Sequence, residues 1–235
     1  MAQLQVLYED NHLIAINKLP SDIVQADRTG DPTLADRVKE YVRERYRKPG
    51  EVFLGIPHRL DRPTSGVVIF ARTGKALERL SAMFREGAVR KIYWALVDHS
   101  PPAPSQTLVH WLRRNPEQNK SYAVDGPGHG AKEARLTYQL LLSLDRYHLL
   151  AIELHTGRHH QIRAQLAAIG IHIKGDLKYG AARSNPGGGI HLHARSVELA
   201  HPVRREPLLI VAEPPREALW TAALEAWKAR PEEAT

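Results

Sequence analysis

The sequence contains no cysteine, few aromatic residues and no long apolar run. Without cysteine, the chain can form no disulfide framework, no thiolate metal site and no cysteine nucleophile. Its apolar runs are far shorter than the ~18 residues that a membrane helix needs. The first residues include Glu9 and Asp10 instead of a basic start followed by an apolar block, so we expect no signal peptide. These absences predict a cytoplasmic protein without a membrane segment.

The charge of the chain is basic overall and unevenly distributed. Lys and Arg number 33 against 26 Asp and Glu, which gives a formal net charge of +7. Most of this excess falls between residues 158 and 205, where eight basic residues stand against two acidic ones. A concentrated field of this sign attracts phosphates, so the expected partner is a polyanion, most often a nucleic acid. A basic surface without a partner is the alternative.

The hydrophobic pattern predicts one α+β domain over residues 1–235 with a mixed, largely antiparallel sheet flanked by helices. Strands are expected at residues 4–8, 12–16, 67–71, 91–97, 136–142 and 147–154. Helices are expected to start at 31–33 and end near 48–50, and to cover about 74–86, 159–169 and, within the C-terminal region 213–230, 216–229. Surface loops are expected at 101–105, 125–130 and 184–189, and a frayed tail at 231–235.

The segment from His58 to Gly66 places one carboxylate, Asp61, between the guanidinium groups of Arg59 and Arg62. Turn residues follow and lead into an apolar strand. Flanking cations favour the ionised form of a carboxyl group and lower its pKa. Such a carboxylate suits a nucleophile or a charge stabiliser better than a general acid. A structural ion pair in a turn is the alternative reading.

A second segment, residues 155–163, leaves a strand, turns at Gly157 and enters a helix. A junction of this kind presents backbone N–H groups and the positive end of a helix. Arg158 and Arg163 lie on it, and each is suited to hold a phosphate or to pair with a carboxylate.

The histidines do not form a metal-binding pattern. His155 and His159 are four residues apart, but the turn at Gly157 breaks the helical face that this spacing requires. His191 and His193 alternate on an expected strand without a nearby acidic third ligand. The glycine-rich motifs of nucleotide-binding loops and the nucleophile elbow are absent as well. We therefore expect neither a metal nor a cofactor.

Several motifs, in order along the chain, resemble the RluA-type pseudouridine synthase family. They are residues 8–10 with Asn17 and Lys18, residues 58–73, residues 91–93, residues 156–163 with 175–176 and 179–180, and finally residues 192–194 with 201–202. The resemblance covers residues 4–212. One departure is the run 19–22, Leu-Pro-Ser-Asp, where the family has a proline and then a small residue and glycine. Because the chain begins at its first strand, it resembles the stand-alone members without an N-terminal S4-like domain.

The resemblance implies that a uridine in folded RNA is isomerised to pseudouridine without a cofactor. It assigns the nucleophile to Asp61, with either the sugar C1′ or the uracil ring as the point of attack. Arg163 is implied to pair with that aspartate, and Tyr93 to lie against the base. Leu192 packs the pocket, and Arg59 takes the position that the flipped uridine vacates.

Arg62 and Arg158 are expected to be further RNA-binding residues. The implied partner is ribosomal or transfer RNA, which a monomer without metal would bind. The alternative function is a non-catalytic RNA-binding or ribosome-assembly factor on the same fold, and a weaker one is a nuclease. A nuclease would lose its activity in chelator, whereas a pseudouridine synthase would not.

Overall fold

The computed structural model describes residues 4–26 and 30–230, which form two compact units. The first unit comprises residues up to 91 together with 187–189 and 194–213, and the second comprises 92–186, 190–193 and the residues from 214 on. The expected tail at 231–235 lies outside the described residues. No helix within the described ranges is long and apolar enough to cross a membrane.

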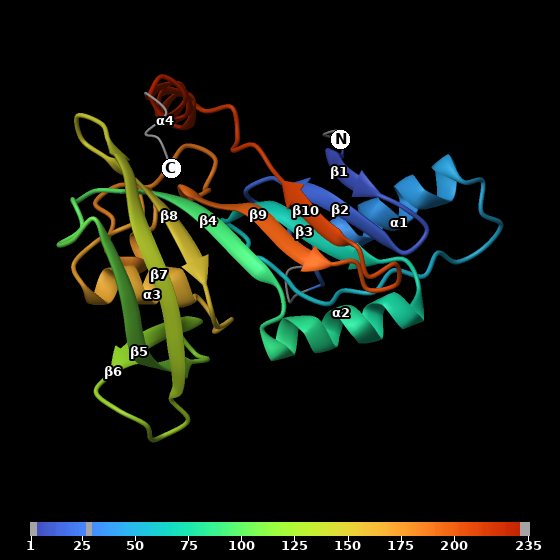
Figure 1. Ribbon diagram of the computed structural model, residues 1–235, viewed down its shortest axis with the longest axis horizontal. Coiled ribbons are helices and arrows are strands. Elements are labelled where there is room, and N and C mark those ends of the chain that lie inside the picture. The colour runs from blue at the N-terminus through green and yellow to red at the C-terminus, as the bar shows by residue number, and fades with distance from the viewer. Residues whose placement is uncertain (1–3, 27–29, 231–235) are drawn as a thin grey trace. The chain divides into compact units, whose positions relative to one another are not determined.

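The first unit consists of antiparallel strand pairs and two helices (Figure 1). Its elements are β1 (Val6–Glu9), β2 (Leu13–Lys18), α1 (Leu34–Arg45), β3 (Ser65–Ala71), α2 (Gly74–Glu86), most of β9 (Leu192–Ala200), and β10 (Pro207–Val211). Strand β2 pairs with β1 on one side and β3 on the other, and β10 pairs with β9. All seven residues of β3 are buried, which places the segment that follows Asp61 in the core.

Both helices of this unit begin with a threonine cap. The side-chain oxygen of Thr33 accepts the N–H of Asp36, and the carboxylate of Asp36 accepts the N–H of Thr33. These two hydrogen bonds form a capping box at the start of α1. Thr73 caps α2, and Gly87 ends it in the left-handed conformation at φ 75°. The buried side chain of Leu80 then packs in one cluster with apolar residues of β2 and β3. The predicted bounds of this helix, 74–86, are confirmed.

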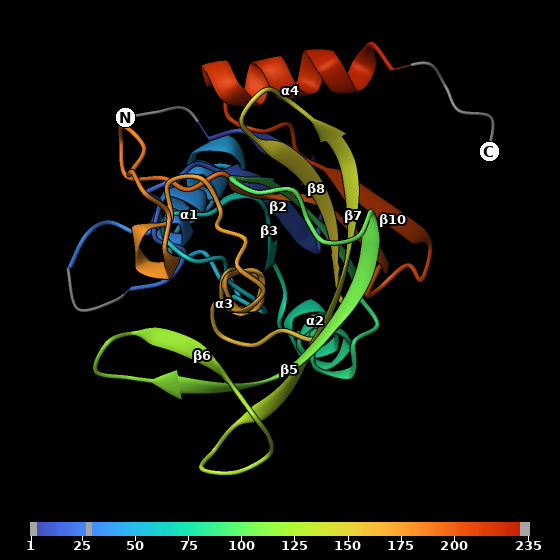
Figure 2. The same ribbon diagram turned by 90° about the vertical axis from the view of Figure 1, so that its left-hand side faces the viewer.

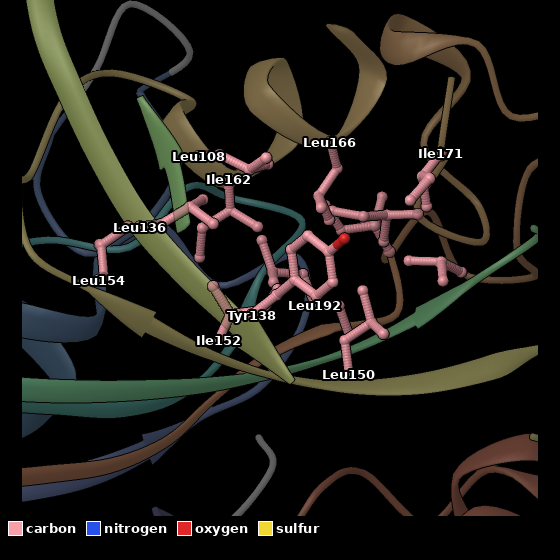
Figure 3. Close-up of a cluster of buried hydrophobic side chains, with 14 residues drawn as sticks. Leu108, Leu136, Tyr138, Leu150, Ile152, Leu154, Ile162, Leu166, Ile171 and Leu192 are labelled. Carbon is pink, nitrogen blue, oxygen red and sulfur yellow. The ribbon is translucent and has the colours of Figure 1, made fainter. Parts of the chain in front are cut away.

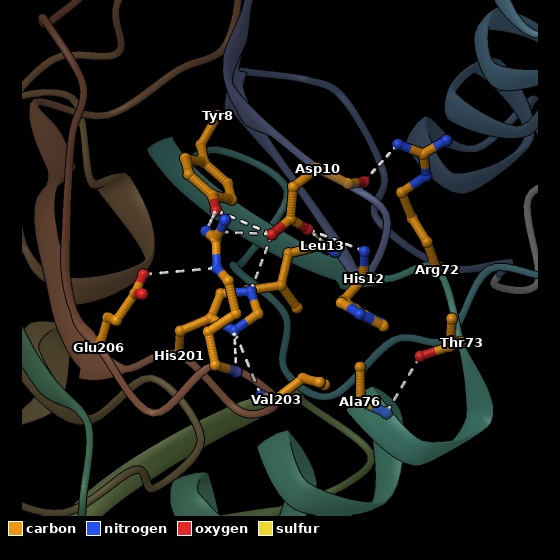
Figure 4. A network of polar contacts seen from close by, with 11 residues as sticks. Tyr8, Asp10, His12, Leu13, Arg72, Thr73, Ala76, His201, Val203 and Glu206 are labelled. Atoms are coloured by element: carbon orange, nitrogen blue, oxygen red, sulfur yellow. Dashed lines mark hydrogen bonds and ion pairs between the residues drawn. The ribbon is translucent and has the colours of Figure 1, made fainter.

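The β1–β2 turn is tied to the β9–β10 turn by the carboxylate of Asp10 (Figure 4). One oxygen accepts the backbone N–H groups of His12 and Leu13 at 2.8 and 2.7 Å. The other accepts the hydroxyl of Tyr8 and lies 2.9 Å from Nε2 of His201. Burial alone would raise the pKa of Asp10, but the two backbone donors hold it below its ordinary value. This motif therefore joins distant parts of the sequence within the first unit.

The second unit consists of antiparallel strands in the order β4-β8-β7-β5-β6. Its elements are most of β4 (Arg90–Val97), β5 (Ser105–Asn115), β6 (Lys120–Val124), β7 (Lys132–Ser143), β8 (His148–Leu154), α3 (Gln161–Ala168), the 3-10 turn η1 (Leu177–Tyr179) and α4 (Ala218–Lys228). Strand β4 alternates between two clusters: Ala95 and Val97 join the one that holds α3, while Trp94 and Leu96 join the one that holds α4. The two helices thus cover opposite faces of these strands, as Figure 2 shows.

The predicted α+β class with largely antiparallel strands is confirmed. Neither β5 nor β6 was predicted as a strand. In this region the sequence predicted only a loop at 101–105, whose last residue, Ser105, begins β5. Helix α3 is shorter than the predicted 159–169, because His160 at its N-cap has φ 52°, outside the helical region. Helix α4 packs Trp220 into the core, as the spacing of its tryptophans indicates. A single domain over 1–235 stays a prediction.

Candidate active site

The backbone of the turn that carries Asp61 is hydrogen-bonded by the buried side chain of Lys18, at the end of β2. Its ammonium group donates to the carbonyl oxygens of Leu19, Arg62 and Thr64 at 3.0, 3.0 and 2.6 Å. The N–H of Thr64 closes the turn by donating to the carbonyl of Asp61 at 3.0 Å. An ammonium group has three donors, so these three carbonyls match it in number. The backbone around Asp61 is therefore fixed to β2.

The protonation of Lys18 is finely balanced. Burial disfavours its charged form and lowers its pKa to about 8, although the nearby carboxylates of Asp22 and Asp61 act in the opposite direction. The charge of Arg62 lowers this pKa further. Lys18 is thus a buried cation whose charge interacts with that of Asp61. A lysine at the last position of a strand gives little sign of such burial in a sequence, apart from its place in the Asn17-Lys18 motif.

His58, the first residue of the 58–66 segment, anchors the other side of the turn. Its Nε2 accepts the N–H of Ile69 in β3 at 2.9 Å, and its ring stacks on Phe84 of α2 with centroids 4.3 Å apart. Burial lowers the pKa of His58 to about 3, and the charge of Lys91 adds to this effect. His58 is therefore neutral at physiological pH, and its Nε2 acts as a hydrogen-bond acceptor.

Gly66 allows the turn to run directly into β3. Its φ is 114°, and a Cβ there would lie 2.3 Å from the carbonyl oxygen and 2.6 Å from the nitrogen of Ala194 in β9. No L side chain fits this approach. The glycine of the motif is thus required by close contact between two strands of the first unit.

The three predicted residues of this segment differ in environment. Asp61 is half-buried, whereas Arg59 and Arg62 are exposed. The guanidinium of Arg62 pairs with the carboxylate of Asp31 at 3.2 Å. The charge of Asp61 in turn raises the pKa of the buried Lys18.

In the second unit, Arg163 is buried on α3 and forms a bidentate pair with Asp176. Its Nε and Nη2 lie 2.6 and 2.7 Å from the two carboxylate oxygens, and both side chains are at most 5% exposed. The guanidinium carbon also lies 4.9 Å from the ring centroid of Tyr179. This pair fixes the plane of the guanidinium, and Nη1 takes no part in it. The role of Asp176 was not predicted, although it lies in the matched Gly175-Asp176 motif.

Tyr93 and Leu192 lie near α3, the helix that carries Arg163. Leu192 is buried in a cluster with Ile162 of α3 (Figure 3). The partly buried Tyr93 packs against this cluster. Ile162 precedes Arg163 in the chain. The structure therefore brings two predicted residues of the second unit, Tyr93 and Leu192, to the cluster that packs against α3, the helix that carries Arg163.

The segment before α3 is held by side-chain contacts with β6 and η1. Nδ1 of His159 lies 2.9 Å from Oγ of Ser121, and Nδ1 of His160 lies 3.0 Å from the hydroxyl of Tyr179. Burial lowers the pKa of His160 to about 2, so this ring is neutral. Arg158 is exposed, and its Nε donates to the carbonyl of Glu133 at 2.8 Å.

One group of side chains has the composition of a metal site, in a place that the sequence did not indicate. Within the described residues, Asp98, His99 and His172 have ligand atoms that all lie within 4.8 Å of one another. The Asp98 carboxylate is 2.9 Å from Nδ1 of His99 and 3.0 Å from Nδ1 of His172. These contacts form a hydrogen-bonded group after the end of β4, and none of the three is a predicted site residue.

Comparison with known proteins supports the resemblance. Residues 12–168 match the family model described as RNA pseudouridylate synthase. An uncharacterized RNA pseudouridine synthase of Synechocystis sp. is 33% identical over 220 residues, which cover 90% of this chain and 66% of that relative. The ribosomal large subunit pseudouridine synthase D of Xylella fastidiosa is 33% identical over 232 residues, with 91% and 67% covered. The chain thus spans about two thirds of the length of these curated relatives.

A solved structure agrees with this result. Human RNA pseudouridylate synthase domain containing 4 is similar with a TM-score of 0.77 and 25% identity, covering 95% of this chain and 93% of that one. The family match covers the Asp61 turn, β4 with Tyr93, and α3 with Arg163. The chain therefore belongs to the RNA pseudouridylate synthase family.

Proposed function

We propose that the protein isomerises a specific uridine in structured ribosomal or transfer RNA to pseudouridine. The reaction breaks the bond between N1 and C1′, turns the uracil and forms a bond between C5 and C1′. The proton on C5 leaves and N1 regains one, so atoms and charge balance without a cofactor. The activity is proposed for a monomer in the cytoplasm, where these RNAs are made and used.

Asp61 is the proposed nucleophile. The observation that carries this proposal is the anchoring of its turn by the three donors of Lys18, which leaves little freedom to the backbone beside the carboxylate. Catalysis needs a reactive group held within a small fraction of an ångström of its working position. Attack on C1′ and attack on the uracil ring both use an ionised carboxylate.

The other residues act on the base and on the charge. Tyr93 is proposed to lie against the uracil and to assist removal of the C5 proton, with Leu192 as the apolar packing beside it. Arg163, oriented by its bidentate bond to Asp176, is proposed to stabilise the anionic form of Asp61. A single reactive carboxylate suits this scheme, because a hydrolase of the paired-carboxylate type needs an acid partner as well.

The uridine has to leave its stack before the reaction, at a cost of a few kcal/mol. Arg59 is exposed beside Asp61 and is proposed to occupy the vacated position, since a guanidinium both stacks and donates hydrogen bonds. Arg62 and Arg158, both exposed, are proposed to contact the RNA backbone.

The test is the variant Asp61→Asn, with Asp31→Asn as the matched control, because Asp31 is the exposed partner of Arg62. We expect Asp61→Asn to abolish pseudouridine formation in mapped total RNA and to keep RNA affinity within about tenfold, since phosphate contacts supply most of the affinity. Asp31→Asn should retain activity. Full activity of Asp61→Asn would refute the proposal.

The alternative is a non-catalytic RNA-binding or ribosome-assembly factor. It predicts that the wild-type protein binds RNA but never converts a uridine, whatever the RNA offered. A nuclease would instead shorten the RNA and stop in chelator. Pseudouridine mapping of RNA with and without the gene therefore separates the three functions.

A further inference from the structure

Three side chains of the second unit contact Asn119, the last residue of the turn between β5 and β6. Arg114 donates from Nη2 to its side-chain oxygen at 3.3 Å, and Nε2 of His159 lies 3.1 Å from the same atom. Lys178 donates to the backbone carbonyl of Asn119 at 3.2 Å, and Lys120 follows Asn119 in the chain. We call Arg114, Lys120, His159 and Lys178 the Asn119 cluster.

The positive charge of this cluster is not balanced by carboxylates. None of the ion pairs among residues 4–26 and 30–230 uses Arg114, Lys120 or Lys178. These three side chains contact neutral groups: carbonyl oxygens, an amide oxygen and the rings of Tyr122 and Tyr179, each 5.0 Å from Nζ of Lys120. The nearest acidic residue in the turn, Glu117, is exposed.

Keeping like charges together costs free energy that a bound polyanion would offset. The mutual effect is visible at His160, whose pKa is lowered first by burial and then by Arg163, His159, Lys178 and Arg114. The cluster also lies at the N-terminal end of α3, where the helix dipole favours anions. Charge, donors and dipole thus favour the same kind of ligand, an anion with several oxygen atoms.

The cluster is also rigidly connected to the helix that carries Arg163. The hydroxyl of Tyr179 accepts the N–H of Ser121 at 2.8 Å and donates to its carbonyl at 3.1 Å. Arg163 lies over one face of the same ring system at 4.9 Å. Figure 2 shows the β5–β6 hairpin beside α3, and the side-chain bonds fix the two together.

We infer that the Asn119 cluster is a binding site for the phosphodiester backbone of the substrate RNA. The inference rests on the proposed function for its RNA ligand. Arginine binds phosphate through its planar fork and lysine as a compact charge, so the cluster offers both kinds of contact. Because it contacts backbone only, it contributes affinity and position without sequence preference.

The test compares the triple variant Arg114→Gln/Lys120→Gln/Lys178→Gln with a control that removes three exposed basic residues elsewhere. The control is Arg43→Gln/Lys48→Gln/Arg85→Gln, at the ends of α1 and α2. Both are made in the Asp61→Asn background, so that binding is read without turnover. The probe is a fluorescently labelled RNA hairpin with a uridine-containing loop, titrated at several salt concentrations.

We expect the cluster variant to bind at least tenfold more weakly at low salt. The slope of log affinity against log salt should fall in magnitude by about 2, since each phosphate contact contributes about 0.7–0.9. The control variant should show smaller changes in both the affinity and the salt slope. Lys178→Gln alone should lower the slope by about 0.8, and Lys178→Arg should leave it unchanged.

Equal affinities and slopes for the two triple variants would overturn the inference. The proposed function fails separately. If the wild type never forms pseudouridine while the cluster variants lose affinity for RNA, the cluster is confirmed and the isomerase proposal is wrong.

Discussion

Replacing Lys18 by methionine removes the ammonium group and keeps the length of the side chain. Three carbonyl oxygens then lose a charged donor, at about 2 kcal/mol each. The variant also avoids the cost of burying the charge. The fall of the Lys18 pKa from 10.5 to about 8 sets that cost at about 3 kcal/mol. The expected net loss of unfolding free energy is therefore about 3 kcal/mol.

For a chain of this length, such a loss corresponds to a fall in melting temperature of about 6–12 °C. The activity should fall further than the stability, because displacement of the Asp61 turn by about 1 Å costs roughly a hundredfold in rate. Thermal unfolding and single-turnover pseudouridine formation, both measured well below the melting temperature, check the two effects. The control is Lys48→Met, which removes an exposed lysine and should change neither quantity.

The reasoning would be refuted if Lys18→Met unfolded within about 1 kcal/mol of the wild type and kept its rate within threefold. It would then follow that the turn around Asp61 is positioned by other contacts. A loss of stability with a normal rate constant in the folded fraction would likewise refute the positioning argument.

Further predictions concern pH and three single residues. The pKa of Lys18 is lower in the folded chain, so the unfolded chain binds more protons between pH 8 and 10.5. The contribution of Lys18 to stability should therefore rise with pH in this range, as measured by chemical unfolding of the wild type and Lys18→Met. The reaction rate should fall over the same range, because deprotonation removes the third donor of the Lys18 side chain. Gly66→Ala should prevent native folding or lower the melting temperature steeply, because its Cβ overlaps the Ala194 backbone. Asp176→Asn should cost about 3–5 kcal/mol by breaking a buried bidentate ion pair, and calorimetry should show most of this recovered in Arg163→Met/Asp176→Leu. Chelator should leave the rate of the wild type unchanged.

The elements that the sequence predicts well are those in which local signals agree. Helix α2 has a threonine cap, an apolar face and a terminal glycine, and its bounds match the prediction. Strand β5 lacks such agreement: only Leu108 and Leu112 are buried, and they are four residues apart rather than two. A strand with so few buried positions has no clear alternation, so its hairpin with β6 could not be found from the pattern.

The residue types of the candidate site could be predicted from the sequence, but the contacts that position them could not. Asp61 and Arg163 are recognised by motif, whereas the bonds that position them depend on tertiary structure. Lys18 is a residue type that is almost never buried, so no sequence rule predicts its position under the turn. Asp176 follows a glycine in a loop, and its bond to Arg163 joins a loop to a helix. Arg62 was expected beside Asp61, but a turn residue has several carboxylates within reach, and its ion pair is with Asp31.

The order of the two units along the chain has a consequence for biosynthesis. The first unit combines residues up to 91 with residues 194–213, whereas nearly all strands of the second lie in the continuous stretch between them. Asp10 can meet His201 only after that stretch has left the ribosome. The second unit therefore has time to collapse on nascent chains while β1–β3 still await β9 and β10. Chaperones that bind exposed apolar strands should consequently engage the early segment rather than the middle one.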